Sequence, residues 1–431
     1  MTTRTICLCA GLCLVLALAA PAAGQPKNII FCIGDGMGPA QVEAARLFAG
    51  ESMSFEDFTF QGSVTTYAAN SSVTDSAAAA TALATGVKVN NGVISLAIPG
   101  DSSELPTLLE YYQDRDRMTG LVTTTYMTHA TPAGFGAHES SRNNNAQIAN
   151  DYLTQTQPNV LFGGGANGMS VAAAQTAGYT VVTDAAGLAG IDTNTETYVS
   201  GQFGSYHLPY EYDGGGDVHL SDMTTTALDM LDNDADGFFM MVEGGRIDHA
   251  GHDNNLARNV YETLEFSATV TDILAWAAGR DDTLVVVTAD HETGGLTILA
   301  DNGPGALPTV SWSTGSHTGA NVPVYAWGMN AGAFEGAMNN TDFWAAVTAG
   351  PGDFNLDGVV DLIDLATLGD GYGLGTTWAG GDTNGDRTVD LLDLGAFGES
   401  YGYDSSAIPE PATLFLLACG ATGLLRSRRR R

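Results

Sequence analysis

The chain has 431 residues, with 16 lysines and arginines against 49 aspartates and glutamates, and its net charge is −33. So acidic a protein excludes nucleic acid as an expected partner. It also repels phosphate esters, so any chemistry on phosphate needs metal ions or an arginine to concentrate positive charge locally. The length exceeds what one compact core usually supports, so processing segments or a further domain are expected at the ends.

Residues 1–24 have the layout of a secretory signal peptide. Arg4 precedes an apolar run from Ile6 to Ala20, and small residues follow. The run is shorter than the roughly 20 residues that a membrane-spanning helix needs, which disfavours a membrane anchor. Of the five cysteines, only Cys32 falls between this segment and the C-terminal tail. No disulfide framework is therefore expected, and Cys32 is interpreted as a small buried thiol.

Short apolar runs alternate with helical stretches from residue 27 to about residue 349. The expected strands are 28–33, 120–124, 159–162, 238–242, 283–288 and 322–327, and the clearest helices are 77–84 and 255–278. This alternation predicts an α/β catalytic domain over residues 25–349, with a mainly parallel central sheet flanked by helices. Functional side chains are then expected at the carboxyl ends of the strands.

Two motifs near the N-terminus place polar side chains at such positions. Asp35 lies in a glycine-rich turn directly after the first strand, where its carboxylate could bind a cation. Ser76 follows Asp75 at the start of an alanine-rich helix, whose N-terminal amides favour an anion. Each motif has an ordinary structural alternative, a turn for the first and a helix-capping serine for the second.

Three later segments add carboxylates and imidazoles. Asp248 and His252 are four residues apart, so they share one face if the segment is helical. Asp290 and His291 end an apolar strand, and His317 precedes the strand expected at 322–327. Taken singly, each of these could be a structural polar residue.

One further pattern is a false positive. Residues 232–243 satisfy the calcium-loop pattern of an EF-hand on paper. The apolar run 238–242 is interpreted as a strand instead of a liganding loop, so residues 232–237 are expected to form a surface turn.

Together these segments match one family. In content, order and spacing, the residues around Asp35, Ser76, His129 to Arg142, Glu243 to His252, Asp290 and His317 resemble the alkaline phosphatases across residues 27–349. The resemblance implies hydrolysis of phosphate monoesters through a phosphoserine on Ser76, with release of inorganic phosphate. It implies one zinc ion on Asp248, His252 and His317, a second on Asp35, Asp290 and His291, a magnesium ion on Asp35, Thr131 and Glu243, and Arg142 as the phosphate clamp.

Two positions depart from the best-known bacterial pattern of this family. His129 stands where that pattern has aspartate, and His249 stands where it has lysine, whereas animal members carry histidine at both. The identity of the third ion is therefore left open. For both histidines, ordinary hydrogen bonding is an alternative to a direct influence on metal or phosphate. Asp75, which directly precedes Ser76, is expected to support the site without binding a metal ion itself.

The alternatives to this function come from two classes of protein. A phosphodiesterase or a sulfatase of the same superfamily is the enzymatic alternative, but Ser76 together with Thr131 and Glu243 favours monoesters. A calcium-dependent surface or matrix protein with an inactive phosphatase fold is a different class of alternative. The presence of every expected ligand type argues against it.

Residues 350–403 contain two similar acidic segments. Oxygen-donor side chains fall at positions 1, 3, 5, 9 and 12 of each, which are calcium-loop spacings. The first set is Asp353, Asn355, Asp357, Asp361 and Asp364, and the second is Asp382, Asn384, Asp386, Asp390 and Asp393. Loops of this kind followed by leucine-rich helices resemble dockerin modules, which fold around calcium and bind cohesin domains. Arg387 replaces the usual glycine of the second loop, and a calcium-stiffened spacer without a partner is the alternative.

Residues 404–431 resemble a PEP-CTERM sorting signal. Pro409-Glu410-Pro411 precedes an apolar stretch and a terminal arginine cluster, the layout that an exosortase reads and cleaves in Gram-negative bacteria. A simple C-terminal anchor is the alternative. Either interpretation places the protein outside the inner membrane, in the periplasm, at the cell surface or in the extracellular matrix. The sequence leaves the oligomeric state open, including a homodimer.

Overall fold

The computed structural model describes residues 25–374 and 377–407. The expected signal peptide, residues 1–24, and the segment 408–431 of the expected sorting tail lie outside the described residues. Within the described part of the chain, none of the helices combines the length and the apolar character that crossing a membrane requires.

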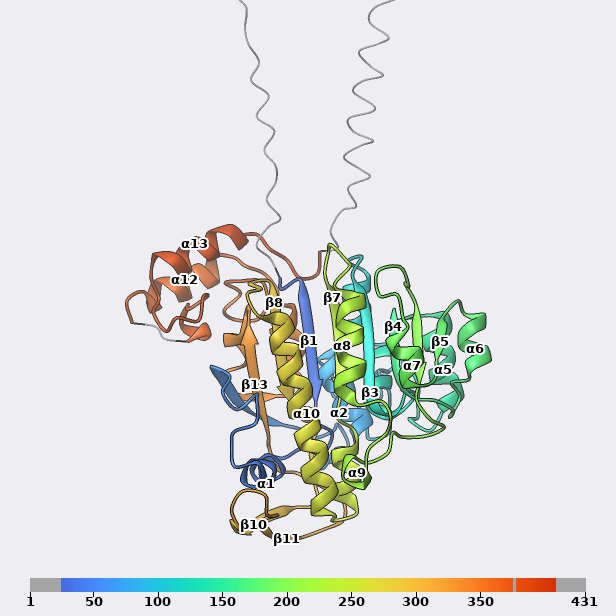
Figure 1. Ribbon diagram of the computed structural model, residues 1–431. Coiled ribbons are helices and arrows are strands. Elements are labelled where there is room, and N and C mark those ends of the chain that lie inside the picture. Colours follow the sequence, from blue (N-terminus) through green and yellow to red (C-terminus); the bar gives the residue numbers. More distant parts are fainter. Residues whose placement is uncertain (1–24, 375–376, 408–431) are drawn as a thin grey trace, which may run out of the picture.

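A sheet of ten strands forms the centre of the molecule (Figure 1). In spatial order the strands are β14 (Gly336–Asn339), β2 (Phe60–Thr65), β13 (Val322–Gly328), β8 (Thr283–Thr288), β1 (Asn28–Ile33), β7 (Phe238–Glu243), β3 (Met118–Tyr126), β4 (Val160–Gly164), β6 (Val199–Gln202) and β5 (Thr180–Val182). Among these strands only β13 runs against the others, pairing antiparallel with both β2 and β8. The mainly parallel α/β prediction is therefore confirmed, and all six expected strands are present.

Helices cover the sheet in two groups. One group is α1 (Pro39–Ala49), α8 (Leu220–Leu231), α9 (Arg246–His252) and α10 (Leu256–Ala277), which pack on one another, with α8 and α10 in front of the sheet in Figure 1. The other is α2 (Ser76–Thr85), α3 (Leu108–Gln113), α4 (Ala130–Gly136), α5 (Asn145–Thr154) and α11 (Asp342–Thr348). The shorter α6 (Val171–Thr176) and α7 (Ala185–Ala189) lie near β5 and α8.

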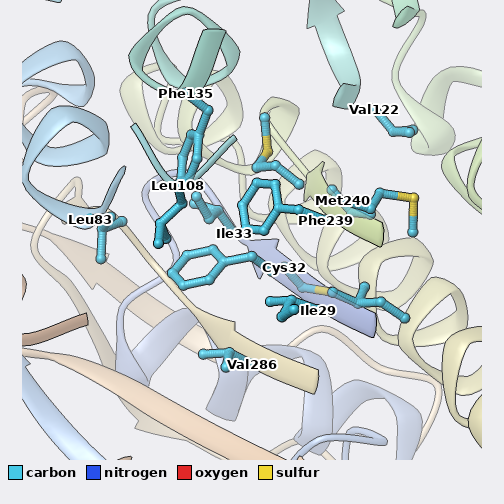
Figure 2. Packing of buried hydrophobic residues seen from close by; sticks show 14 of the residues in the cluster. Ile29, Cys32, Ile33, Leu83, Leu108, Val122, Phe135, Phe239, Met240 and Val286 are labelled. Atoms are coloured by element: carbon cyan, nitrogen blue, oxygen red, sulfur yellow. The ribbon is translucent and has the colours of Figure 1, made fainter. Parts of the chain in front are cut away.

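The core follows from the parallel pairing. Strands covered on both faces must be apolar throughout, and every residue of β1, β7 and β8 is buried. Figure 2 shows Phe239 of β7 packed with Phe135 and Leu108 from the helices. Cys32 is fully buried, and burial raises the pKa of its thiol well above the usual range, as expected for an inert structural cysteine.

The strand directions decide where the functional segments meet. β1, β7 and β8 all end at the same edge of the sheet, and β2 also ends there before the chain leads into α2. Because β13 runs the opposite way, the segment that precedes it lies at this edge as well. The short strands β9 (Glu292–Thr293) and β12 (His317–Thr318) then pair antiparallel, with His317 opposite Thr293. Beside them, β10 (Leu296–Ala300) and β11 (Thr309–Trp312) form a separate hairpin.

The segment with the EF-hand pattern is not a calcium loop in the structure. Residues 238–243 form the buried strand β7, as predicted. Asp232 instead pairs with Arg280 at 2.6 Å, and Asp234 accepts a hydrogen bond from the backbone N–H of Met118.

The C-terminal repeat folds into two equivalent halves. Its helices α12 (Leu362–Gly371) and α13 (Leu391–Ser400) are capped at their N-termini by Asp361 and Asp390, and the short helix η3 (Trp378–Gly380) lies between them. In each half the last loop carboxylate, Asp364 or Asp393, accepts backbone hydrogen bonds from the start of its own loop. The two loops therefore close in the same way.

Both ends of the described chain lie at the edge of the sheet opposite the functional segments. The side chain of Gln25 donates to the Tyr111 hydroxyl, and that hydroxyl donates to the backbone carbonyl of Ser405 at 3.0 Å. Arg115 donates to the carbonyl of Ala407 at 3.1 Å. Residues 25 and 407 are thus held beside the same helix, α3.

Phe31 on β1 offers a test of the core. Its ring is fully buried, 5.7 Å from that of Phe135 and 5.6 Å from that of Phe343. We expect Phe31→Ala to lower the free energy of unfolding by about 3–5 kcal/mol, because it removes apolar contacts and leaves a cavity. Urea denaturation followed by circular dichroism measures this loss. Leu299→Ala, at a position 61% exposed, is the control and should change the value by less than about 0.5 kcal/mol.

Candidate active site

Ser76 is the first residue of α2, but it does not cap that helix. The preceding Asp75 is the cap, and its Oδ1 accepts hydrogen bonds from the backbone N–H groups of Ala78 and Gly92, each at 3.0 Å. The Ser76 hydroxyl is therefore free of the capping role, and its Oγ lies 3.3 Å from Nε2 of His291. Since the helix N-terminus favours an anion, the hydroxyl lies where a phosphoryl group can bind.

The first metal-ligand cluster is Asp248, His252 and His317, whose ligand atoms all lie within 4.8 Å of one another. Asp248 and His252 share one face of α9, as their spacing predicts. Nδ1 of His252 donates to the Gly315 carbonyl at 2.8 Å, so its Nε2 faces the cluster, 3.1 Å from Nε2 of His317. A hydrogen bond to Asp248 raises the pKa of His252 to about 9. The same negative field attracts a metal cation.

His317 is oriented in the same manner. Its Nδ1 donates to the carbonyl of Thr74 at 2.9 Å, which directs Nε2 toward Asp248 at 3.6 Å. Both imidazoles of the cluster thus have one nitrogen fixed by a backbone carbonyl and the other turned inward. This is the arrangement that zinc-binding histidines adopt.

The second cluster is Asp35, Asp290 and His291, all fully buried. Neither carboxylate oxygen of Asp35 accepts a hydrogen bond from any described residue. Oδ2 of Asp290 likewise has no hydrogen-bond partner among these residues. Burial raises the pKa of Asp290 to about 8, and burial together with the Asp290 charge raises that of Asp35. Buried carboxylates with unpartnered oxygens need a cation to stay ionised, so a metal ion fits this donor set.

The third cluster is Asp35, His129 and Glu243. Oε1 of Glu243 has no hydrogen-bond partner among the described residues, and burial raises the pKa of this carboxyl to about 7. The hydroxyl of Thr131 is also buried without a hydrogen-bond partner among those residues. It lies close enough to Glu243 to oppose part of the rise in the pKa of that carboxyl. His129, whose role the sequence left open, therefore belongs to the cluster itself.

Arg142 is held by Asp75, the residue that precedes Ser76. Its Nη1 donates to Oδ2 of Asp75 at 3.1 Å, and its Nη2 lies 3.3 Å from Nε2 of His129. The side chain is 25% exposed, so part of the guanidinium remains accessible to a substrate. Asp75 thus holds both the start of α2 and the arginine, which fixes the distance between hydroxyl and cation.

His249 lies near the clusters without joining any of the three. Its Nδ1 faces Nη1 of Arg246 at 2.9 Å, and its ring lies 5.6 Å from that of His129. Burial, opposed only in part by Asp248, lowers the pKa of His249 to about 4. The imidazole is therefore neutral at neutral pH and accepts a hydrogen bond from the arginine.

Sequence reasoning missed two residues of the site. The hydroxyl of Thr293 lies 2.5 Å from Oδ1 of Asp248 and 3.2 Å from Nδ1 of His291, so it connects the first two clusters. Its place two residues after His291 was the available signal. The ring of His207 lies 4.3 Å from that of His249. The loop that carries His207 packs directly on Gly164, because a Cβ at Gly164 would lie only 1.5 Å from the carbonyl oxygen of Tyr206. No pattern in the sequence marks His207.

Comparisons with known proteins agree with this geometry. A family model described as alkaline phosphatase matches residues 26–310, and a PEP-CTERM protein-sorting motif matches residues 407–431. Alkaline phosphatase 3 of Bacillus subtilis strain 168 is 33% identical over 407 residues, covering 73% of this chain and 87% of the relative. The Escherichia coli K12 alkaline phosphatase is 30% identical, covering 76% and 86%.

A solved structure shows the same likeness. The alkaline phosphatase of the Antarctic bacterium TAB5 superposes with a TM-score of 0.68 at 30% identity, covering 75% of this chain and 97% of that one. Solved structures of the TAB5 enzyme also include a histidine-to-aspartate mutant with Mg bound in the M3 site.

Thr293 generates a prediction for this site. Thr293→Val keeps the shape of the side chain but removes its hydrogen bonds to Asp248 and His291. Because such outer partners orient metal ligands, we expect metal affinity to fall about 10–100-fold, measured by competition with a chromophoric chelator. Thr293→Ser keeps the hydroxyl and is the matched control. Equal affinities in the wild type and the valine variant would contradict the assigned role.

Proposed function

Because this chain belongs to the alkaline phosphatase family and is a phosphomonoesterase, we propose that Ser76 is its nucleophile. The Ser76 oxygen attacks phosphorus, the bond from phosphorus to the leaving alcohol breaks, and a phosphoserine forms. Water then attacks from the side that the alcohol vacated, and inorganic phosphate leaves as the serine bond breaks. The observation that carries this proposal is the Ser76 hydroxyl, free of capping and 3.3 Å from His291 between the metal-ligand clusters.

Metal ions belong to the chemistry of this family, and metal-binding residue groups are present here. We assign zinc to the Asp248, His252 and His317 cluster and to the Asp35, Asp290 and His291 cluster, because mixed carboxylate and imidazole donors suit zinc. When bound, these ions would lower the pKa of the Ser76 hydroxyl and stabilise the leaving oxygen.

Arg142 and its partners do the remaining work in this proposal. The guanidinium presents two parallel N–H groups to the non-bridging phosphate oxygens, a geometry that lysine cannot match. Asp75 keeps the arginine at a fixed distance from Ser76, and the neutral His249 adds no charge of its own beside the phosphate. The protein thus binds a dianion in spite of its acidic surface.

For the third cluster we propose magnesium, held by Asp35, Glu243 and Thr131 with His129 beside them. Carboxylate and hydroxyl oxygens are the donors that magnesium prefers, whereas the imidazole of His129 is a softer donor. The TAB5 mutant with Mg in its M3 site, in which aspartate replaces a histidine, supports this interpretation by similarity.

The PEP-CTERM motif indicates export in a Gram-negative bacterium and processing by an exosortase-type enzyme. We propose the periplasm, the cell surface or the extracellular matrix as the location. The segments assigned are a signal peptide at 1–24, the catalytic domain at 25–349, the dockerin-like repeat at 350–403 and the sorting tail at 404–431. We further propose calcium in both loops of the repeat, supported by their equivalent closure. A cohesin-like partner and a homodimer stay predictions.

The nucleophile is tested on the mature chain from residue 25, prepared with zinc and magnesium. We expect Ser76→Ala to lose at least about 10³-fold in kcat on p-nitrophenyl phosphate, because the substitution removes the oxygen that attacks phosphorus in this proposal. Wild-type activity on bis(p-nitrophenyl) phosphate should be far lower. A diester turned over faster than the monoester would instead favour the phosphodiesterase alternative. Unchanged circular dichroism and metal content in the variant exclude unfolding as the cause.

His129 tests the third ion. His129→Asp replaces an imidazole by a carboxylate in the third cluster, so magnesium retention should rise by on the order of tenfold, measured by elemental analysis across a magnesium titration. His249→Asp is the matched control, because it adds the same charge nearby at a residue outside the three clusters. Equal magnesium retention in the two variants would show that charge alone, and not the cluster, controls binding.

A further inference from the structure

The C-terminal repeat does not project from the molecule as a free module. It lies at the amino end of β2, where the strand begins with Phe60, whereas the opposite end of that strand leads to Ser76. In Figure 1, α12 and α13 lie far from α9, the helix that carries Asp248. The repeat therefore contacts the catalytic domain at the edge of the sheet away from the active site.

An apolar contact forms the centre of this interface. Trp378 of η3 is 3% exposed and packs on Gly332. A side chain at position 332 would be crowded, because its Cβ would lie 3.2 Å from the Cβ of Trp378. The indole N–H donates to the carbonyl of Asp353 at 3.1 Å, so the first calcium loop supports the tryptophan. Phe354 packs edge-on against the same ring at 5.9 Å.

The second loop adds a polar contact through Arg387. Its Nη1 donates to both carboxylate oxygens of Glu335 at 2.8 and 2.9 Å, and its Nη2 reaches the carbonyl of Thr59 at 3.4 Å. The guanidinium also lies over the ring of Phe60, 5.1 Å from its centre. One side chain of the repeat thus contacts two separate segments of the catalytic domain.

The backbone at Arg387 shows what this contact requires. Its φ is +70°, a left-handed conformation that favours glycine, and Gly358 at the equivalent place in the first loop has φ +89°. The sequence therefore places arginine where the loop geometry suits glycine. An arginine at this position is expected to weaken calcium binding by the loop. In the structure, however, its side chain forms the interface contacts with Glu335 and Thr59.

Arg387 also connects this interface to the calcium loop. Its backbone N–H donates to Oδ2 of Asp382 at 2.9 Å, and Asp382 is the first residue of the second loop. A cation held by Asp382 and its neighbours would fix the loop in this closed form. The arginine, and with it the contact to Glu335, would then be held in place.

We propose that the repeat's binding partner is the catalytic domain of its own chain, with Arg387 coupling the second calcium loop to the stability of that domain. This inference rests on the calcium loops proposed above. Calcium bound by the closed second loop stabilises the repeat by mass action, and the ion pair between Arg387 and Glu335 transmits that stabilisation to β2 and its neighbours. Substrate turnover is unaffected, because the interface lies away from the pocket.

The discriminating variant is Arg387→Gly, which gives the second loop the glycine that the first loop already has. Calcium is titrated by calorimetry into the zinc- and magnesium-loaded mature chain, and the temperature of half-inactivation of the phosphatase is measured with and without calcium. We expect calcium to raise that temperature by about 2–4 °C in the wild type. In Arg387→Gly the rise should fall below about 1 °C, with the same calcium stoichiometry and unchanged kcat and KM.

Two controls separate the possible failures. Arg46→Ala removes an exposed ion pair with Glu43 elsewhere and should leave the calcium-dependent rise intact. The double variant Arg387→Glu with Glu335→Arg should restore part of the rise. A full rise in Arg387→Gly would overturn the coupling, and no calcium heat in the wild type would overturn the calcium loops together with the coupling. Neither result would affect Ser76, which the phosphatase assay tests separately.

Discussion

The structure depends on one electrostatic constraint, the crowding of four buried carboxylates into a single pocket. Asp35, Glu243, Asp248 and Asp290 are all nearly or fully removed from water. The pKa of Asp35 is raised, and those of Glu243 and Asp290 lie at about 7 and 8. Such a cluster of carboxylates stays ionised only with cations among them, so the charge state of the pocket depends on metal ions.

The sheet topology makes this crowding geometrically possible. Three parallel strands, β1, β7 and β8, deliver Asp35, Glu243 and Asp290 to one edge, and the single reversed strand β13 returns His317 to the same edge. Rigid, fully buried strands hold these side chains in place, as a site that must bind several ions requires. Asp75 extends this order beyond the metal ligands, since its one carboxylate accepts hydrogen bonds from both the start of α2 and Arg142.

Much of this could be predicted from the sequence, because apolar runs define the buried strands and the polar residues that follow them define the site. The segments around Asp35 and Asp290 were found this way, whereas Ser76 was placed at the start of a helix and Asp248 by its spacing of four residues from His252. What escaped prediction depends on tertiary contacts. His207 reaches the site on a loop whose position is set by Gly164, and Thr293 acts through a strand pairing of two residues. The interface of Arg387 with Glu335 was equally hidden, because the loop pattern alone suggested only a poor calcium position.

The placement of the two described ends, both beside α3, has a consequence for how the enzyme would sit on a surface. Residue 407 lies at the amino edge of the sheet and the pocket at the carboxyl edge, so a support attached directly at residue 407 would face away from the pocket. In a molecule attached in this way, the active-site pocket would face the surrounding solution, from which dissolved phosphate esters arrive, and not the support.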